Sequence, residues 1–117
     1  MASPDPHVSL RSVELHILLS VVDRPRHGYA ILQEAEERTV GRPGFEIPTL
    51  YRALRRLRRA GLIRTVQPPE PDADERREYW RATSLGRRML EAELTRLGGL
   101  VAVGLSRIAQ AKVGGRR

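Results

Sequence analysis

Apolar residues recur at helical spacing through the first third of the chain and predict two helices. The first has a candidate N-cap at Ser9 and ends near Asp23, because Pro25 disfavours helical geometry in the residue before it. The second runs from about 27 to 39, and the glycines and proline of segment 41–44 end it. Its inner face is expected to consist of Tyr29, Ile31, Leu32 and Ala35, with Glu34, Glu36 and Glu37 outside.

A third helix is expected over 48–60, because proline at position 48 suits a first helical turn and Gly61 is placed to close the helix in the left-handed conformation. At about 100° per residue, Leu50, Leu54 and Leu57 share one face of this helix. The opposite face carries four arginines, Arg52, Arg55, Arg56 and Arg59. We therefore expect the leucines to pack inward and the guanidinium groups to point to solvent.

Two runs with strand character follow, at 62–67 and 77–83, and loop-forming residues separate them. They predict a β-hairpin with a long tip. Helical periodicity then returns from Ser84 to about Ala111, with the hydroxyl of Thr83 or Ser84 as a candidate N-cap.

The last helix carries a heptad seam formed by Leu90, Leu94, Leu97, Val101, Gly104, Ile108 and Ala111. Three helices and a hairpin already close a small core, so we expect this seam to meet the same helix of a second subunit in a homodimer. A stripe that covers the first helix of its own chain is the alternative. Gly98, Gly99 and Gly104 each weaken a helix by about 1 kcal/mol relative to Ala, which favours a kink or a close helix approach.

Charge is concentrated on the third helix and the first strand. The segment 47–67 holds six arginines and no acidic residue, so it accounts for almost all of the formal net charge of +7. Such a block is typical of a surface that binds a polyanion. Thr49 and Tyr51 flank the helix start, where free N–H groups favour phosphate. A solvated surface, or ion pairs with the acids of the second helix and the hairpin, would also fit these arginines.

The remaining composition excludes several kinds of site. The chain has 117 residues, enough for one domain, and its lack of cysteine excludes disulfides and thiolate metal sites. His7, His16 and His27 are too dispersed for a metal site, neither Thr83 nor Ser84 has a plausible base nearby, and the glycine-rich segment lacks the Lys-Ser/Thr of a nucleotide loop. No membrane-length apolar run or signal peptide is recognised. We expect a cytoplasmic protein that is not an enzyme and needs no metal or cofactor.

Three motifs resemble the PadR-like transcriptional regulators, in the short form with one C-terminal helix. They are HGYAIL at 27–32, TLYRALRRLRRAGLI at 49–63 and REYWRATSLGRRML at 77–90. The resemblance covers roughly residues 9 to 110. It implies a dimeric transcriptional repressor that binds double-stranded DNA. In this family the third helix enters the major groove and the last helix pairs the subunits.

Pattern and resemblance together predict a mostly α protein with a small β-hairpin. Residues 1–8 would form a disordered tail, 9–83 a winged helix-turn-helix DNA-binding domain, 84–111 a dimerisation helix and 112–117 a basic tail. The expected DNA-binding residues are Thr49, Tyr51, Arg52, Arg55, Arg56, Arg59, Arg76 and Arg77, and the expected dimerisation residues are Leu90, Leu94, Leu97, Val101 and Ile108.

The sequence departs from the family pattern at two positions and at the hairpin tip. Pro48 and Ala82 stand where Gly and a larger aliphatic residue are usual. Acidic residues at the tip would be repelled by phosphate, so we expect Arg76 and Arg77, at the base of the returning strand, to make the backbone contacts instead; the acids are Glu70, Asp72, Asp74 and Glu75.

The family resemblance also implies a small-molecule effector between the subunits, held in some members by aromatic residues of the last helix. Here that helix has no Trp, Tyr or Phe, so the effector and its site stay unknown. Two other functions fit the basic face: a winged-helix module that binds an acidic protein partner, and RNA or membrane-surface binding. The second fits less well, because the core needs the apolar face of the helix and interleaved exposed aromatic residues are missing.

Overall fold

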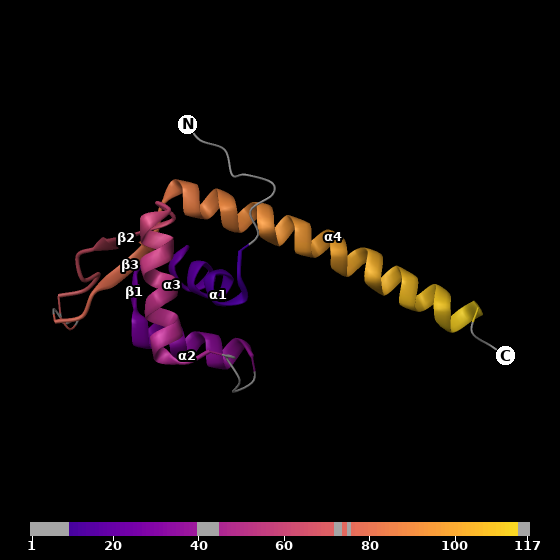
Figure 1. Cartoon of the computed structure of the whole chain (residues 1–117), viewed down its shortest axis with the longest axis horizontal. Helices are drawn as coiled ribbons and strands as arrows, with labels where there is room; N and C mark the ends of the chain where they lie inside the picture. Colours follow the sequence, from indigo (N-terminus) through magenta and orange to yellow (C-terminus); the bar gives the residue numbers. More distant parts are fainter. Residues whose placement is uncertain (1–9, 40–44, 72–73, 75, 115–117) are drawn as a thin grey trace.

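The computed structural model describes residues 10–39, 45–71, 74 and 76–114. Its elements, in chain order, are α1 (Ser12–Val21), β1 (Arg26–His27), α2 (Gly28–Arg38), α3 (Ile47–Arg59), β2 (Ile63–Val66), β3 (Tyr79–Ala82) and α4 (Ser84–Gly114). Figure 1 shows α1, α2, α3 and the sheet gathered at one end, while α4 leaves this head as a long rod. The mostly helical winged-helix architecture is confirmed.

The helix ends differ from the expected ones by a few residues. The N-cap expected at Ser9 and the expected tail 1–8 lie outside the described residues, and α1 begins at Ser12 after Arg11. The backbone N–H of Arg11 donates to Oε1 of Glu14 at 2.9 Å, which satisfies a donor at the start of the helix. At the other end of the chain, α4 continues past Ala111 to Gly114, so the first three residues of the expected basic tail are helical.

The sheet has a third strand, β1, that the sequence pattern does not predict. The strand order is β1-β3-β2, and both pairings are antiparallel. Arg26 of β1 pairs with Trp80 of β3, and His27 pairs with Tyr79. The two residues of β1 are too few to show a strand pattern in the sequence. They form a strand only because they pair with β3.

One buried cluster holds the head together. Val13, Ile17, Leu18 and Val21 of α1 contribute to it, together with Ile31, Leu50, Ala53, Leu54, Leu57, Leu62, Ile63, Trp80, Met89 and Leu90. Each fully buried aliphatic side chain of this kind contributes about 1.5–3 kcal/mol. The expected inner face of α2 is right for Ile31 and Ala35 and wrong for Tyr29, which is 54% exposed. Tyr29 lies in the first turn of α2, at the surface of the head.

A polar network joins the end of α1 to α2. Arg26 pairs with Oε2 of Glu34 at 2.6 Å, and Arg38 pairs with Oε1 of the same carboxylate at 3.0 Å. Arg38 also donates to Oγ of the buried Ser20 at 2.9 Å and to the carbonyl oxygen of His16 at 2.8 Å. Glu34 therefore lies between two guanidinium groups that fix the angle between the first two helices.

Thr83 connects the sheet, α3 and α4. Its hydroxyl donates to the carbonyl oxygen of Gly61 at 2.6 Å and accepts the backbone N–H of Gly86 at 3.1 Å, so Thr83 caps α4 as expected. Its own N–H donates to the carbonyl oxygen of Leu62 at 3.0 Å. Gly61 closes α3 with φ of 76°, as the sequence predicted.

The first turns of α4 belong to the core of their own chain. Met89, Leu90 and Glu93 are buried, and Oε2 of Glu93 accepts the backbone N–H of Leu10 at 3.0 Å. That hydrogen bond and Arg96 hold the pKa of the Glu93 carboxyl below its ordinary value. The assignment of Leu90 to a dimer interface was wrong, because Leu90 is only 4% exposed within the single chain.

Candidate nucleic-acid interface

The outward face of α3 is basic, as the leucine spacing predicted. Leu50, Leu54 and Leu57 are buried, whereas Arg52, Arg55 and Arg59 are exposed. Arg58 is exposed as well, although it is not among the predicted DNA-binding residues. Arg52 donates to Oγ1 of Thr49 at 3.2 Å, which draws its guanidinium toward the start of the helix. Among the described residues, no carboxylate pairs with any of these four arginines.

Arg56 does not point to solvent as expected. Its side chain is 35% exposed, and its Nε lies 3.5 Å from Oε2 of Glu14 on α1. This Nε is buried without a hydrogen-bond partner in the described part of the chain. Helical angles alone cannot reveal Glu14, because the carboxylate comes from another helix. Arg56 therefore ties α3 to α1 and is the least available of the predicted DNA-binding arginines.

Tyr51 lies directly over the start of α2. A Cβ atom on Gly28 would come within 2.8 Å of the Tyr51 hydroxyl oxygen, so a side chain at position 28 would displace the end of the Tyr51 ring. The ring of Tyr51 remains 42% exposed. The HGY and TLY motifs therefore lie side by side, with the hydroxyl end of Tyr51 in the space beside Gly28.

A hollow of about 380 Å³ opens beside this contact, lined by His27, Gly28, Tyr29, Tyr51, Arg76, Arg77, Glu78 and Trp80. Nδ1 of His27 accepts the backbone N–H of Ala30 at 3.1 Å and so caps α2. The Arg77 guanidinium lies 5.8 Å over the centre of the Tyr29 ring, a cation–π geometry. The HGY motif was the signal for His27 and Tyr29, but its geometry was not readable from the sequence.

The charge of His27 is disfavoured in the folded chain. Partial burial, and then the nearby guanidinium of Arg77, lower the pKa of the His27 imidazole from its ordinary value of 6.5. Nη1 of Arg77 lies 3.1 Å from each ring nitrogen of His27. The neutral ring is also the form that can accept the N–H of Ala30.

The two arginines at the base of the hairpin, Arg76 and Arg77, form ion pairs with one carboxylate. Arg76 Nε lies 3.2 Å from Oδ1 of Asp74, and Arg77 Nε lies 3.4 Å from Oδ2 of the same carboxylate. Asp74 thus offsets part of their charge. Glu70 is exposed, while Asp72 and Glu75 lie outside the described residues.

The apolar stripe of α4 is uncovered beyond the head. Leu94, Val101 and Ile108 are 43%, 58% and 55% exposed, and Leu97 is half-buried. At about 100° per residue, Leu100 and Leu105 widen the same stripe. The glycines at 98, 99 and 104 have nothing within 4 Å of a Cβ position, and α4 is one continuous helix through all three.

Within the described residues, no group of three histidine or acidic side chains is placed to hold a metal ion. None of the described helices combines the length and apolarity that crossing a membrane requires.

Comparison with known proteins agrees with this geometry. The model of the transcriptional regulator PadR-like family matches residues 17–92. No curated protein matches the chain. Similar solved structures include a PadR family transcription regulator from Clostridium difficile, with 21% identity over 84% of this chain and 99% of that one and a TM-score of 0.67.

Two further structures are similar in fold. A PadR-like transcriptional regulator from Bacillus cereus has 21% identity over 84% of this chain and 91% of that one, with a TM-score of 0.67. A Streptococcus transcriptional regulator has 23% identity over 83% of this chain and 91% of that one, also with a TM-score of 0.67.

Proposed function

We propose that this chain, which belongs to the PadR-like family of transcriptional regulators, binds an inverted-repeat DNA operator as a homodimer and represses by occupying it. The observation that carries the proposal is the exposed basic face of α3, whose arginines at 52, 55, 58 and 59 have no carboxylate partner among the described residues. A surface of this charge is complementary to phosphate and to guanine edges.

In the proposed complex α3 lies in the major groove, which is about 12 Å wide and admits a helix. Arg52, Arg55 and Arg59 face the base edges, where a guanidinium can donate two hydrogen bonds to guanine. Thr49 and Tyr51, at the start of α3, contact the phosphate backbone. Arg77 lies beside them and contacts the phosphate backbone of the same DNA strand, and the Tyr29 ring packs against its guanidinium.

The stripe of α4 is the proposed subunit contact. Leu94, Leu97, Val101 and Ile108 meet their counterparts on the partner, and Leu100 and Leu105 extend the contact. A two-fold axis through this contact relates the two copies of α3 in the dimer. Each copy enters one of two successive major grooves, which are about 34 Å apart on one side of a duplex. Two half-sites then act together, which raises the affinity above that of one head.

Selection of bound duplexes from a random pool, followed by fluorescence anisotropy of the selected duplex at several salt concentrations, tests the proposal. We expect an inverted repeat to emerge. Log affinity should fall linearly with log salt concentration, with a slope of magnitude about 0.9 for each phosphate neutralised. A flat salt response, or the absence of any enriched sequence, would contradict it.

A further inference from the structure

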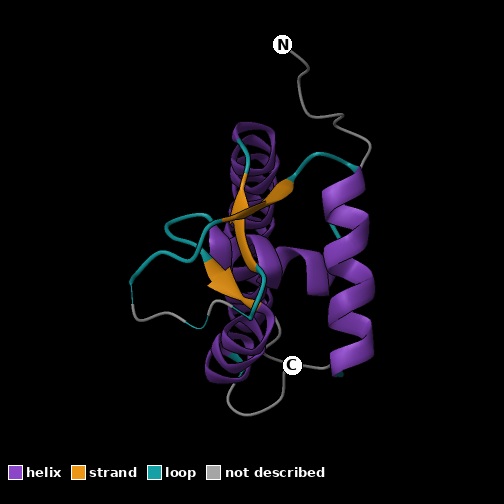
Figure 2. Cartoon of the chain, turned by 90° about the vertical axis from the view of Figure 1, so that its left-hand side faces the viewer, coloured by secondary structure: helices purple, strands orange, loops and turns teal. Residues whose placement is uncertain are grey.

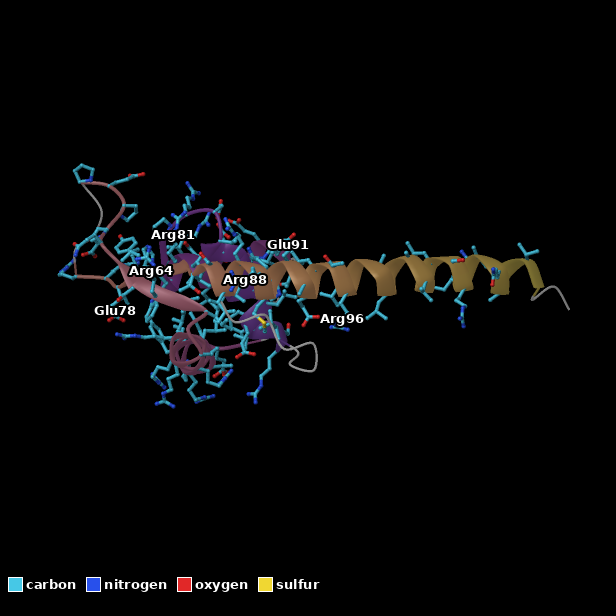
Figure 3. The ribbon with its side chains drawn as sticks, turned by 90° about the horizontal axis from the view of Figure 1, so that it is seen from above. Arg64, Glu78, Arg81, Arg88, Glu91 and Arg96 are labelled. Carbon is cyan, nitrogen blue, oxygen red and sulfur yellow. The ribbon has the colours of Figure 1, made fainter. Side chains whose placement is uncertain are left out.

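A second group of arginines lies on the outer face of the sheet. Ile63 and Trp80 belong to the buried cluster that contains Leu54 and Leu57 of α3, so α3 packs on that side of the sheet. Side chains alternate along a strand, and Arg64 and Arg81 therefore point to the opposite side. Figure 3 shows these two arginines near each other, above the sheet, with α3 end-on below it.

Arg64 and Arg81 are direct cross-strand partners in the β2–β3 register. Like charges in directly opposed positions destabilise a sheet. Neither arginine pairs with a carboxylate among the described residues, and the same holds for Arg87 in the first turn of α4. Three guanidinium groups of three different elements thus lie near one another without a counter-charge from the described chain.

These arginines surround a hollow of about 460 Å³, which is also lined by Val22, Ala82, Thr83 and Ser84. The hydroxyl of Ser84 and the positive end of the α4 dipole lie at the same edge. In Figure 2 the strands lie in front, and the helices lie beside and behind them. Arg64, Ser84 and Arg87 of the lining are exposed, so the hollow is open to solvent, and it is large enough for a small molecule with an anionic group.

We propose that this hollow binds the oxyanion of a small molecule, a phosphate or carboxylate group, through Arg64, Arg81 and Arg87. An anion between the first two arginines removes their mutual repulsion, and each guanidinium offers a planar pair of donors that matches either group. The site is separate from the proposed DNA contact, because α3 lies on the core side of the sheet. It joins the base of the hairpin to the first turn of α4.

Titration of the ¹⁵N-labelled protein with sodium phosphate tests the site, with sodium chloride adjusted to keep ionic strength constant. We expect saturable shifts of the backbone amide signals of Arg64, Arg81 and Ser84. Arg81→Gln should weaken this phosphate affinity at least tenfold. The matched control is Arg107→Gln, which removes one exposed charge from the distal part of α4 and should leave the affinity unchanged. Linear shifts without saturation, or equal losses in both variants, would overturn the proposal.

A second measurement separates the site from a DNA contact, using anisotropy of a random-sequence duplex. If Arg81 contacted a DNA phosphate, Arg81→Gln would reduce the salt slope by about 0.9 relative to Arg107→Gln. We expect the two variants to have the same slope. A reduced slope for Arg81→Gln would make the outer face part of the DNA surface and would overturn the assignment to a small molecule. The phosphate titration does not depend on DNA binding, so the two proposals can fail separately.

Discussion

Gly86 is the residue with the least room to change. A Cβ atom at this position would lie 2.0 Å from the carbonyl oxygen of Leu62, the oxygen that accepts the N–H of Thr83. The backbone of residue 86 fixes the position of the Cβ atom, and the atom that it meets is a backbone oxygen, so a rotamer change cannot relieve the contact. The glycine allows α4 to begin directly against the end of α3.

Gly86→Ala should therefore lower the free energy of unfolding by about 2 kcal/mol, because overpacking at a backbone contact forces the elements apart. Gly99→Ala is the matched control, since the same substitution in the same helix meets no atom within 4 Å. Alanine there should raise stability by about 1 kcal/mol. Urea denaturation of both variants measures the difference, and equal effects would refute the tight contact at Gly86.

His27 gives the fold a pH dependence. Its pKa is lowered by burial and Arg77, so the unfolded chain binds the proton more readily than the folded chain. Stability is then complete above the unfolded pKa of about 6.5 and is lost as the pH falls below it, toward the folded pKa. His16, whose pKa is lowered by burial and Arg38, acts in the same direction.

We expect the urea midpoint to fall between pH 7 and pH 5.5, and to fall less in His27→Asn. Asparagine keeps an acceptor for the N–H of Ala30 but does not titrate. The difference between the two proteins isolates the contribution of His27 from that of His16. A parallel decline in both would show that the imidazole of His27 contributes nothing to the pH dependence.

At the scale of elements, the residues of α3 proposed to bind DNA and the residues that stabilise the fold lie on different faces of the helix. Arg52→Ala with Arg55→Ala should leave the urea midpoint nearly unchanged, because both side chains are exposed. The affinity for the selected operator should fall at least tenfold, since one lost bidentate guanine contact costs about 1–3 kcal/mol. Unfolding of this double variant would mean that the basic face is not the outer face.

Arg56→Ala is the contrasting variant. It leaves Glu14, which is 14% exposed, without its guanidinium partner, and should cost about 0.5–1 kcal/mol of stability. Its effect on operator affinity should be smaller than that of the double variant. Anisotropy and urea denaturation on the same samples distinguish the two roles, and the opposite ranking would return Arg56 to the DNA-contacting set.

The sequence predicted elements whose signal lies within their own residues. The leucines of α3, the left-handed Gly61 and the cap at Thr83 follow from local spacing and chemistry, and all three are confirmed. The errors concern partners that are distant in sequence. Strand β1 exists through pairing with β3, and Arg56 is drawn inward by Glu14.

Another error concerns the point along α4 at which the helix leaves the head. Leu90 and Leu94 occupy equivalent places in the heptad pattern, yet Leu90 is buried and Leu94 is 43% exposed. Periodicity specifies a face of α4 but not where along the helix the core ends. The DNA-contacting and dimerisation residues themselves remain predictions.

At the scale of the whole molecule, the free part of α4 determines assembly. Val101→Glu with Ile108→Glu places two charges on the proposed interface and should give a species with the 13.2 kDa mass of one chain in sedimentation equilibrium. Operator affinity should fall by about 10²–10⁴-fold, because the second head no longer adds its binding. Ala102→Glu, at an exposed position beside the stripe, should keep the dimer. A wild-type monomer at micromolar concentration would contradict the assembly.

The junction at Thr83 makes the long helix a lever. One residue, Thr83, separates β3 from α4, and its side chain and backbone are hydrogen-bonded to Gly61 and Leu62, in the turn between α3 and β2. A rotation of α4 therefore also rotates the head, which contains α1, α2, α3 and the sheet. A small change in the crossing angle of two such rods would therefore alter the distance between the paired heads, and with it the operator spacing that the pair can span.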